Sequence, residues 1–254
     1  LIDKVAPTSS RVIIYGDSGT GKDLVAKEIH KKSQYSSGNF IIVNSALMEP
    51  NGIEEELFGL EENSRIIKEG FFEQANNGTL FIDEIGDMPI QTQSKILRVL
   101  TDSSFYRVGS NIPVNINARL LCSSTENLEK LVEEGNFRMD LFHRLNVVSI
   151  TLPKLSDRIQ DIDKLIEYFS KIYLVNTGFK VSDLRDYIKT NYMSYEWPGN
   201  VRELRNIIER YCIIGGKIPE NKDELDSGFN SKNVISMPLK NARKIFEKNY
   251  LESQ

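Results

Sequence analysis

The sequence predicts an α/β domain built on a parallel sheet, followed by a smaller all-helical domain. Two observations support the sheet. Short apolar runs rich in β-branched residues alternate with helical patterns, which is typical of parallel strands covered on both faces. A glycine-rich loop also joins the first of these runs to a helix. After Leu152-Pro153 the strand signals stop and only helical patterns follow, which indicates the second domain.

The first domain is expected to span residues 1–152. Its expected strands are Val12–Tyr15, Phe40–Val43, Thr79–Ile82, Arg119–Cys122 and Val147–Leu152. The clearest helical patterns between them lie at 23–32, 91–101 and 137–145. Because the carboxyl ends of parallel strands meet at one edge of a sheet, the loops after these strands should form a common functional edge.

The helical domain is expected at 153–217. Its helical patterns lie at about 157–173, 181–191 and 200–213, and the turn Trp197-Pro198-Gly199-Asn200 precedes the last of them. The final region, 218–254, is expected to hold the rest of a polar linker at 216–236 and an amphipathic helix at 239–251.

Composition narrows the class of protein. A net charge of −4 gives no overall basic field that would attract nucleic acid or anionic lipid. No apolar run reaches the roughly 18 residues of a membrane span. Cys122 and Cys212 lie in apolar or helical patterns and are interpreted as buried thiols in a reducing compartment, the cytoplasm.

The loop after Tyr15 carries the strongest motif. It reads Gly16, Asp17, Ser18, Gly19, Thr20, Gly21, Lys22, Asp23, which fits the phosphate-loop pattern G-x-x-x-x-G-K. Glycines let backbone N–H groups surround a phosphate, the helix N-terminus adds partial positive charge, and Lys22 neutralises the terminal phosphates. A glycine-rich turn without a ligand is the alternative. Asp23 stands where a Ser or Thr usually supplies a hydroxyl to magnesium.

Two carboxylates end the apolar run Leu80–Ile82. Asp83 is the candidate that holds Mg²⁺ through water, and Glu84 is the candidate that polarises the attacking water. Strands often end in acidic residues, so the functional interpretation of this pair depends on the phosphate loop that precedes it in the chain.

Several longer motifs resemble the central AAA+ domain of bacterial enhancer-binding proteins, the sigma-54-dependent transcription activators. They are Glu56–Gly59, Gly78–Gly86, Lys95–Leu100, Arg107–Gly109, Phe137–Leu141, Arg144–Val148 and Trp197–Leu204. The resemblance runs in order through nearly the whole chain. It implies an AAA+ P-loop NTPase with a five-stranded parallel sheet and a helical lid, which binds ATP and Mg²⁺.

The resemblance also implies roles for single residues. Asn44 would be the switch residue that holds the acid Glu84, although a turn-forming Asn at a strand end is the alternative. Arg138 and Arg144 would be arginine fingers that reach the γ-phosphate of a neighbouring subunit, or else surface arginines. Arg202 would be the lid arginine that senses nucleotide, or else part of a lid salt bridge.

Other residues are interpreted without a catalytic role. Trp197 is expected in the core of the lid. His30 and His143 are expected to be ordinary helix residues, because neither has a second metal-type ligand at useful spacing.

Two departures from the family limit the resemblance. Family members carry a loop with the motif Gly-Ala-Phe-Thr-Gly-Ala that touches the sigma factor; here Leu60–Glu69 is shorter and lacks it. The sensor strand ends Ser123-Ser124-Thr125 where the family has Ala-Thr-Asn, so the positioning of water or γ-phosphate could be weaker. Asp23 departs less, since the family commonly has Glu there.

Two functional hypotheses result. The chain is a slow ATPase that regulates transcription as a ring-type homo-oligomer, or a dimer in isolation, without the standard sigma-54 contact. The alternative is a module that holds nucleotide without much turnover and regulates through ordinary RNA polymerase. A cyclic dinucleotide effector has no positive support in the sequence. A protein-unfolding or translocating motor is disfavoured, because pore aromatics and a basic channel do not stand out.

The expected partners follow from the same resemblance. They are further copies of the chain, RNA polymerase or a sigma factor, and DNA through a helix-turn-helix domain after the C-terminus. The first residue is Leu rather than Met, so the sequence is interpreted as a piece of a longer protein.

Overall fold

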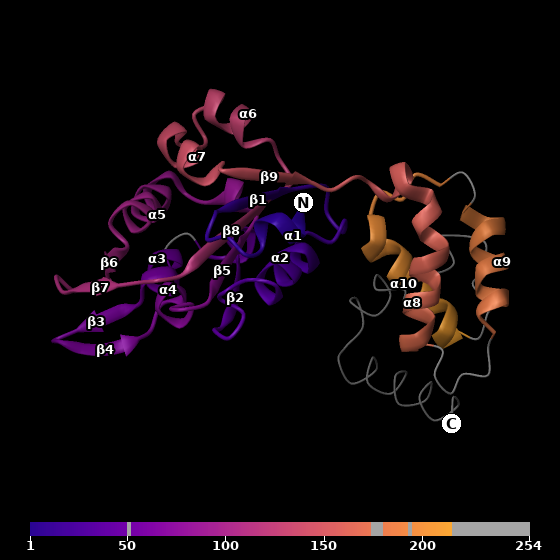
Figure 1. Ribbon diagram of the computed structural model, residues 1–254, viewed down its shortest axis with the longest axis horizontal. Helices are drawn as coiled ribbons and strands as arrows, with labels where there is room; N and C mark the ends of the chain where they lie inside the picture. Colours follow the sequence, from indigo (N-terminus) through magenta and orange to yellow (C-terminus); the bar gives the residue numbers. More distant parts are fainter. Residues whose placement is uncertain (50–51, 174–179, 193–194, 215–254) are drawn as a thin grey trace, which may run out of the picture. The chain divides into compact units, whose positions relative to one another are not determined.

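The computed structural model, which describes residues 1–49, 52–173, 180–192 and 195–214, contains a five-stranded sheet (Figure 1). Its strands are β1 (Val12–Tyr15), β2 (Phe40–Asn44), β5 (Thr79–Asp83), β8 (Arg119–Ser124) and β9 (Val148–Thr151). They pair in the order β2-β5-β8-β1-β9, and every pair is parallel. The predicted parallel sheet and its five strands are confirmed.

Side chains alternate between the two faces of the sheet, as a strand period of two requires. Ile13 packs in the larger core, while Val12 and Ile14 pack in the smaller one. The larger core draws on α3 (Ile53–Phe58), α4 (Phe71–Gln74), α5 (Ile90–Asp102), α6 (Leu128–Glu133) and α7 (Met139–Leu145). The smaller core is closed by α1 (Ile2–Val5) and α2 (Lys22–Lys31). Both faces are therefore covered, as predicted.

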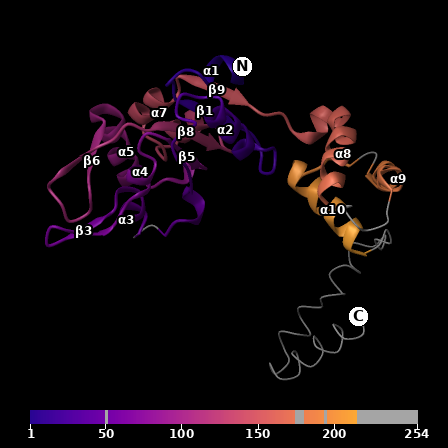
Figure 2. The same ribbon diagram turned by 60° about the horizontal axis from the view of Figure 1, so that its bottom comes forward.

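Two hairpins were not predicted. The first joins β3 (Leu60–Glu62) to β4 (Arg65–Lys68) and the second joins β6 (Ser104–Tyr106) to β7 (Pro113–Asn115); Figure 2 shows β3 and β6 at the same end of the sheet unit. The turn residues Asn63 and Ser64 both have positive φ, 50° and 62°, which is the geometry of a tight two-residue hairpin turn. The segment in place of the family's Gly-Ala-Phe-Thr-Gly-Ala loop is thus a closed hairpin.

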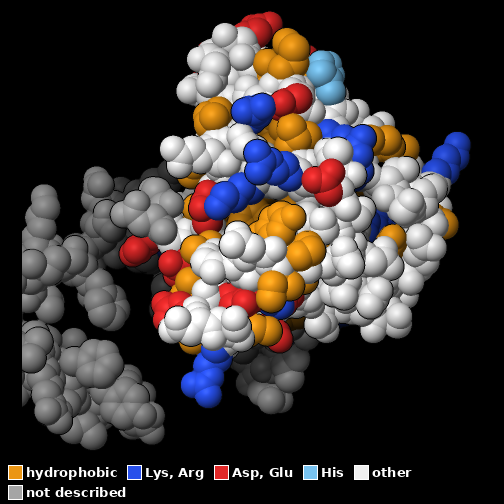
Figure 3. Space-filling view, turned by 90° about the vertical axis from the view of Figure 1, so that its left-hand side faces the viewer, with side chains coloured by type: hydrophobic (Ala, Val, Ile, Leu, Met, Phe, Trp, Pro, Cys, Tyr) orange, Lys and Arg blue, Asp and Glu red, His pale blue; other side chains and the backbone are white. Residues whose placement is uncertain are grey.

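A largely buried ion triad connects the bases of these hairpins. Arg107, just after β6, binds Glu61 of β3 at 3.0 Å and Glu73 of α4 at 2.6 Å and 2.9 Å. Backbone bonds from Glu61 to Val108 and from Val108 to Gly59, both 2.9 Å, support the same junction. Beyond the junction, Ile66, Ile67, Tyr106 and Ile112 are exposed, and Figure 3 shows hydrophobic side chains interspersed with basic ones on this end.

The chain divides into two compact units. The first comprises Leu1–Lys164 with Ser194–Arg205, and the second comprises Leu165–Met193 with Asn206–Gln254. The predicted domain boundaries at 152 and 217 stay a prediction. The linker and last helix expected at 216–236 and 239–251 lie outside the described residues.

The second unit is helical where it is described. Its helices are the greater part of α8 (Ile162–Tyr173), all of α9 (Val181–Tyr192) and the end of α10 (Asn200–Ile214). Tyr187 and Tyr211 pack with ring centroids 5.1 Å apart, and Arg185 pairs with Glu167 at 2.9 Å. The prediction of one helix from 157 to 173 was wrong at its start. Residues Leu155–Asp161 form a tight 3₁₀ segment that is interrupted at Arg158, whose φ and ψ are not helical.

Several smaller predictions can be checked directly. Cys122 and Cys212 are buried free thiols, as predicted, and burial raises the pKa of both. Trp197 is buried and packs edge-on against Tyr195. Among the described residues, no helix is long and apolar enough to cross a membrane. Nor does this part of the chain bring three His, Cys, Asp or Glu side chains together as a metal site.

Candidate functional site

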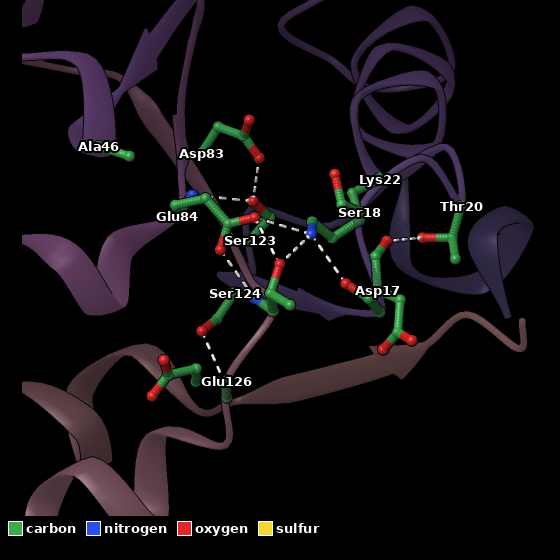
Figure 4. A network of polar contacts seen from close by, with 12 residues as sticks. Asp17, Ser18, Thr20, Lys22, Ala46, Asp83, Glu84, Ser123, Ser124 and Glu126 are labelled. Atoms are coloured by element: carbon green, nitrogen blue, oxygen red, sulfur yellow. Dashed lines mark hydrogen bonds and ion pairs between the residues drawn. The ribbon is translucent and has the colours of Figure 1, made fainter. Parts of the chain in front are cut away.

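The carboxyl ends of β1, β5 and β8 bring the candidate site together (Figure 4). Lys22, the first residue of α2, is buried, and its ammonium group donates three hydrogen bonds of 2.8 Å. The acceptors are the carbonyl oxygen of Gly16, Oε1 of Glu84 and Oγ1 of Thr125. An ammonium group has three donors, so all of them are engaged.

Glu84 is held from two sides. Besides the lysine, Thr125 donates its backbone N–H to Oε2 at 2.8 Å and its hydroxyl to Oε1 at 2.6 Å. Burial works to raise the pKa of Glu84, but these hydrogen bonds and the charge of Lys22 outweigh burial and lower it. Glu84 has a positive φ of 54°, a conformation uncommon for a residue with a side chain and often found at functional sites.

Asp83 has different partners. Asn44 donates its amide to Oδ2 at 3.1 Å, and the hydroxyl of Ser123 donates to Oδ1. The expected contact between Asn44 and Glu84 is therefore not the one that the structure contains. The reason is the register of the sheet, which pairs Asn44 of β2 with Asp83 of β5. Ser123 also accepts from the backbone N–H of Glu84 at 3.1 Å, so it links the two acids.

The glycine loop is a defined turn. Thr20 donates its hydroxyl to the carbonyl of Asp17 at 2.7 Å, and the Asp17 carboxylate pairs with Lys154 at 3.1 Å. Gly19 has φ 79°, and a Cβ there would lie 2.3 Å from the carbonyl oxygen of Gly199, so only glycine fits. Asp23 is exposed and pairs with Lys27 one turn along α2.

The start of α10 contacts the same loop. Arg202 donates to the hydroxyl of Ser18 at 2.9 Å, and Asn200 donates its amide to the carbonyl of Ser18 at 3.0 Å. The backbone N–H of Val201 donates to the carbonyl of Gly19 at 3.0 Å. Arg158 reaches the loop as well, with a 3.0 Å bond to the carbonyl of Thr20.

The two candidate fingers do not contact this site. Arg138 forms a two-pronged pair with Asp140, at 2.7 Å and 3.0 Å, and donates to the hydroxyl of Ser94 at 3.1 Å. Arg144 donates to the carbonyl of Leu100 at 2.9 Å, near the end of α5. Every predicted site residue except these two lies at the loop, at the acid pair or at the start of α10.

Two cavities border the site. One of about 550 Å³ is lined by Tyr15, Gly16, Thr125 and Lys154, among others. The other, of about 440 Å³, is lined by Glu84, Asp87, Glu126 and Glu134, among others. Burial, followed by the charges of Glu84 and Glu126, raises the pKa of Asp87.

Sequence reasoning left five contributors out of the candidate site: Ser123, Thr125, Lys154, Arg158 and Asn200. Ser123 and Thr125 had a signal in the sequence, because they belong to the sensor segment Ser123–Thr125 at the end of β8, the strand adjacent to β5. Lys154 and Arg158 follow β9 without a local pattern that distinguishes them from other basic residues.

The parallel sheet, the strand–loop–helix and the acid pair opposite the buried lysine define the AAA+ class of P-loop NTPases. Within that class, the sigma-54 interaction domain family matches residues 1–151 and the AAA+ ATPase lid domain matches 156–235. The first match covers more than half of the chain, so the chain belongs to the sigma-54 interaction domain family.

Named relatives agree with this assignment. The chain is 39% identical to the nitrogen assimilation regulatory protein NtrX of Azorhizobium caulinodans, over 100% of this chain and 59% of the relative. It is 44% identical to the DNA-binding transcriptional regulator NtrC of Salmonella typhimurium, over 81% of this chain and 45% of the relative. A crystal structure of NtrX from Brucella abortus in complex with ATP matches with a TM-score of 0.76 and 41% identity, covering 99% of this chain and 58% of that one. The chain thus spans about half the length of these relatives.

Proposed function

We propose that the chain is the ATP-binding AAA+ domain of a bacterial transcription regulator and that it hydrolyses ATP slowly. One observation carries the proposal, the 2.8 Å contact between Lys22 Nζ and Glu84 Oε1. It places the cation that would neutralise the terminal phosphates beside the carboxylate that would orient the attacking water. The lowered pKa of Glu84 keeps that carboxylate ionised at neutral pH. The NtrX structure with ATP supports the choice of nucleotide.

Slow turnover is expected from the same contacts. Each of the three donors of Lys22 already has an acceptor. A phosphate oxygen can therefore accept a hydrogen bond from Lys22 only by displacing at least one of these acceptors. Thr125 likewise holds both oxygens of Glu84. Binding and hydrolysis would then include a rearrangement that lowers the rate.

Asp83 fits the role of magnesium holder. Carboxylate oxygens are the ligands that Mg²⁺ prefers, and it usually keeps several of its waters. Asp83 lies beside Glu84 at the carboxyl end of β5, where the hydrogen bonds from Asn44 and Ser123 orient it. When bound, the ion would neutralise charge that develops on the phosphates.

The arginines support a shared site between copies. The carbonyl of Arg144 accepts a hydrogen bond from Arg11, which precedes β1, whereas the phosphate loop follows β1. The four residues of β1 place the backbone of Arg11 and the phosphate loop about 13 Å apart. This separation supports a role for Arg144 at the nucleotide of a second copy rather than at its own, and with it a ring-type oligomer.

The whole protein would act on transcription through RNA polymerase or a sigma factor, and on DNA through a domain beyond these residues. We propose that it does so without the standard sigma-54 contact. The β3–β4 hairpin closes in two residues and replaces the longer family loop.

Hydrolysis at increasing protein concentration tests the proposal. Because the sites are shared, turnover per chain should rise cooperatively as copies assemble. Glu84→Gln should abolish turnover while ATP still binds. Absence of turnover at every concentration would contradict the ATPase.

The alternative, a module that binds nucleotide and remains hydrolytically idle, is favoured by the engaged state of Lys22 and Glu84. Calorimetry would select it by showing tight ATP or ADP binding beside negligible hydrolysis. A difference in oligomer size between samples with and without nucleotide would then show that nucleotide controls the assembly of this module.

A further inference from the structure

A basic recess lies at the edge of the sheet opposite the phosphate loop. It is a cavity of about 260 Å³ lined by Arg11, Arg119, Tyr35 and Leu100, among others, and its remaining lining is mostly apolar. Among the residues that the structure describes, no carboxylate lines this cavity. Arg144 belongs to the same surface, because its guanidinium binds the carbonyl of Leu100 and its own carbonyl binds Arg11.

Arg11 is attached to the end of the helix that carries Arg144. Its Nη1 donates to the carbonyl of Arg144 at 2.9 Å. That carbonyl belongs to the last turn of α7, where a helix has no internal donors left, so an external cation stabilises the helix end. The bond also fixes the backbone from which the Arg144 side chain leaves the helix.

Within the described residues, the charges of Arg11 and Arg144 are not neutralised by acids. Burial lowers the pKa of Arg11, and the neighbouring charge of Arg144 lowers it further. In the part of the chain that the structure describes, neither arginine has an ion pair. Arg138 differs, because Asp140 already pairs with it. Two guanidinium groups held close without a counter-ion form a receptor for an anion.

We propose that Arg11 is a positioning residue for Arg144, and that together they direct positive charge at the terminal phosphate of a nucleotide held by a second copy of this chain. This inference rests on the proposed ATPase. Arg11 fixes the end of α7 through its hydrogen bond and adds a second positive charge beside the finger. It acts in trans, since its own phosphate loop lies at the other end of β1.

Subunit mixing tests this inference. Arg11→Met retains its own loop and Glu84, so it should bind ATP with KM within about twofold of native while kcat falls at least about tenfold. Glu84→Gln is inactive in its own site but keeps Arg11 and Arg144. An equal mixture of the two variants should hydrolyse ATP faster than the sum of each alone, because the Glu84→Gln subunit supplies the arginines to its neighbour.

Two control variants and one substitute for Arg11→Met accompany the mixing experiment. Arg65→Met removes an exposed arginine of β4 and should leave turnover unchanged. Arg11→Lys keeps a donor and a charge and should restore kcat to within about threefold of native. If Arg11→Met fails to bind ATP, Arg11→Gln replaces it, since its side chain keeps polar groups but carries no charge.

The outcomes separate two failures. If the native chain shows no turnover, the proposed function fails and this inference fails with it. If the native chain turns over ATP but Arg11→Met matches it, only this inference is overturned. It is also overturned if mixing Arg11→Met with Glu84→Gln gives no more than the sum, because the loss would then lie within one subunit.

Discussion

Asn44 donates its side-chain amide to Asp83, 3.1 Å away, and leaves Glu84 to Thr125 and Lys22. The two adjacent carboxylates are therefore held by separate side chains, while Ser123 links the Asp83 carboxylate to the backbone N–H of Glu84. Asn44 and Asp83 are paired in the β2–β5 register, whereas Glu84 lies just past the strand, where its positive φ accompanies a turn toward β8. Each acid can consequently be perturbed without removing the direct partner of the other.

Thr125→Val should raise the pKa of Glu84, because the variant lacks the hydroxyl that donates to Oε1. The acidic limb of the pH profile of kcat/KM should then move to higher pH, because this ratio reports ionisations of the free enzyme. Asn44→Ala is the matched control and should leave that limb in place. Equal shifts in both variants would contradict the division of the two acids.

Lys22→Ala should weaken ATP binding about a hundredfold, because it removes the cation next to the phosphates. Lys27→Ala is the control, since Lys27 lies on the same helix but is exposed and pairs only with Asp23 among the ion pairs of the described chain. Calorimetric titration with ATP measures both. Unchanged affinity in Lys22→Ala would refute the nucleotide site itself.

Arg119→Met should lower the free energy of unfolding by about 3 kcal/mol. Arg119 is buried and donates four hydrogen bonds to the carbonyls of Val5, Ala6 and Ser10, which the variant would leave without this donor. Arg98→Met, on the exposed face of α5, should change it by less than about 0.5 kcal/mol. Urea unfolding measures the free energy of unfolding of both variants. Equal effects would show that the hydrogen bonds from Arg119 to these carbonyls contribute little to stability.

Stability should fall as the pH drops below about 6.5, the ordinary value for histidine. Burial, and then the charge of Arg119, lowers the pKa of His30 in the folded chain. The unfolded chain then binds a proton that the folded chain does not, so acid favours unfolding until the folded pKa is passed. His30→Gln should reduce the difference in unfolding free energy between pH 7.5 and 5.5. An unchanged difference would exclude His30 as its source.

Much of the sheet unit could be predicted because its signals are local. Apolar β-branched runs marked all five strands, and the glycine loop marked the start of α2. The rule that parallel strands end at one edge also predicted that Lys22 and the acid pair would meet. It could not determine which oxygen each donor would choose, and in this structure Asn44 contacts Asp83 rather than Glu84.

The remaining features depend on contacts between distant residues. All four side chains of β4 are exposed, so the β3–β4 hairpin has no alternation of buried and exposed positions to reveal it. Arg119 binds carbonyls more than a hundred residues away, and Arg11 binds one 133 residues away. Backbone carbonyls are present at every residue, so sequence alone gives no indication of such partners.

The ion triad at the hairpin bases has a mechanical consequence. Pulling Glu61 away from Arg107 would leave both charges without their partner in a poorly hydrated place, which is unfavourable. A force on the tip of either hairpin should therefore move both hairpins before it separates Glu61 from Arg107. The β3–β4 and β6–β7 hairpins should move as one rigid body that pivots at Arg107.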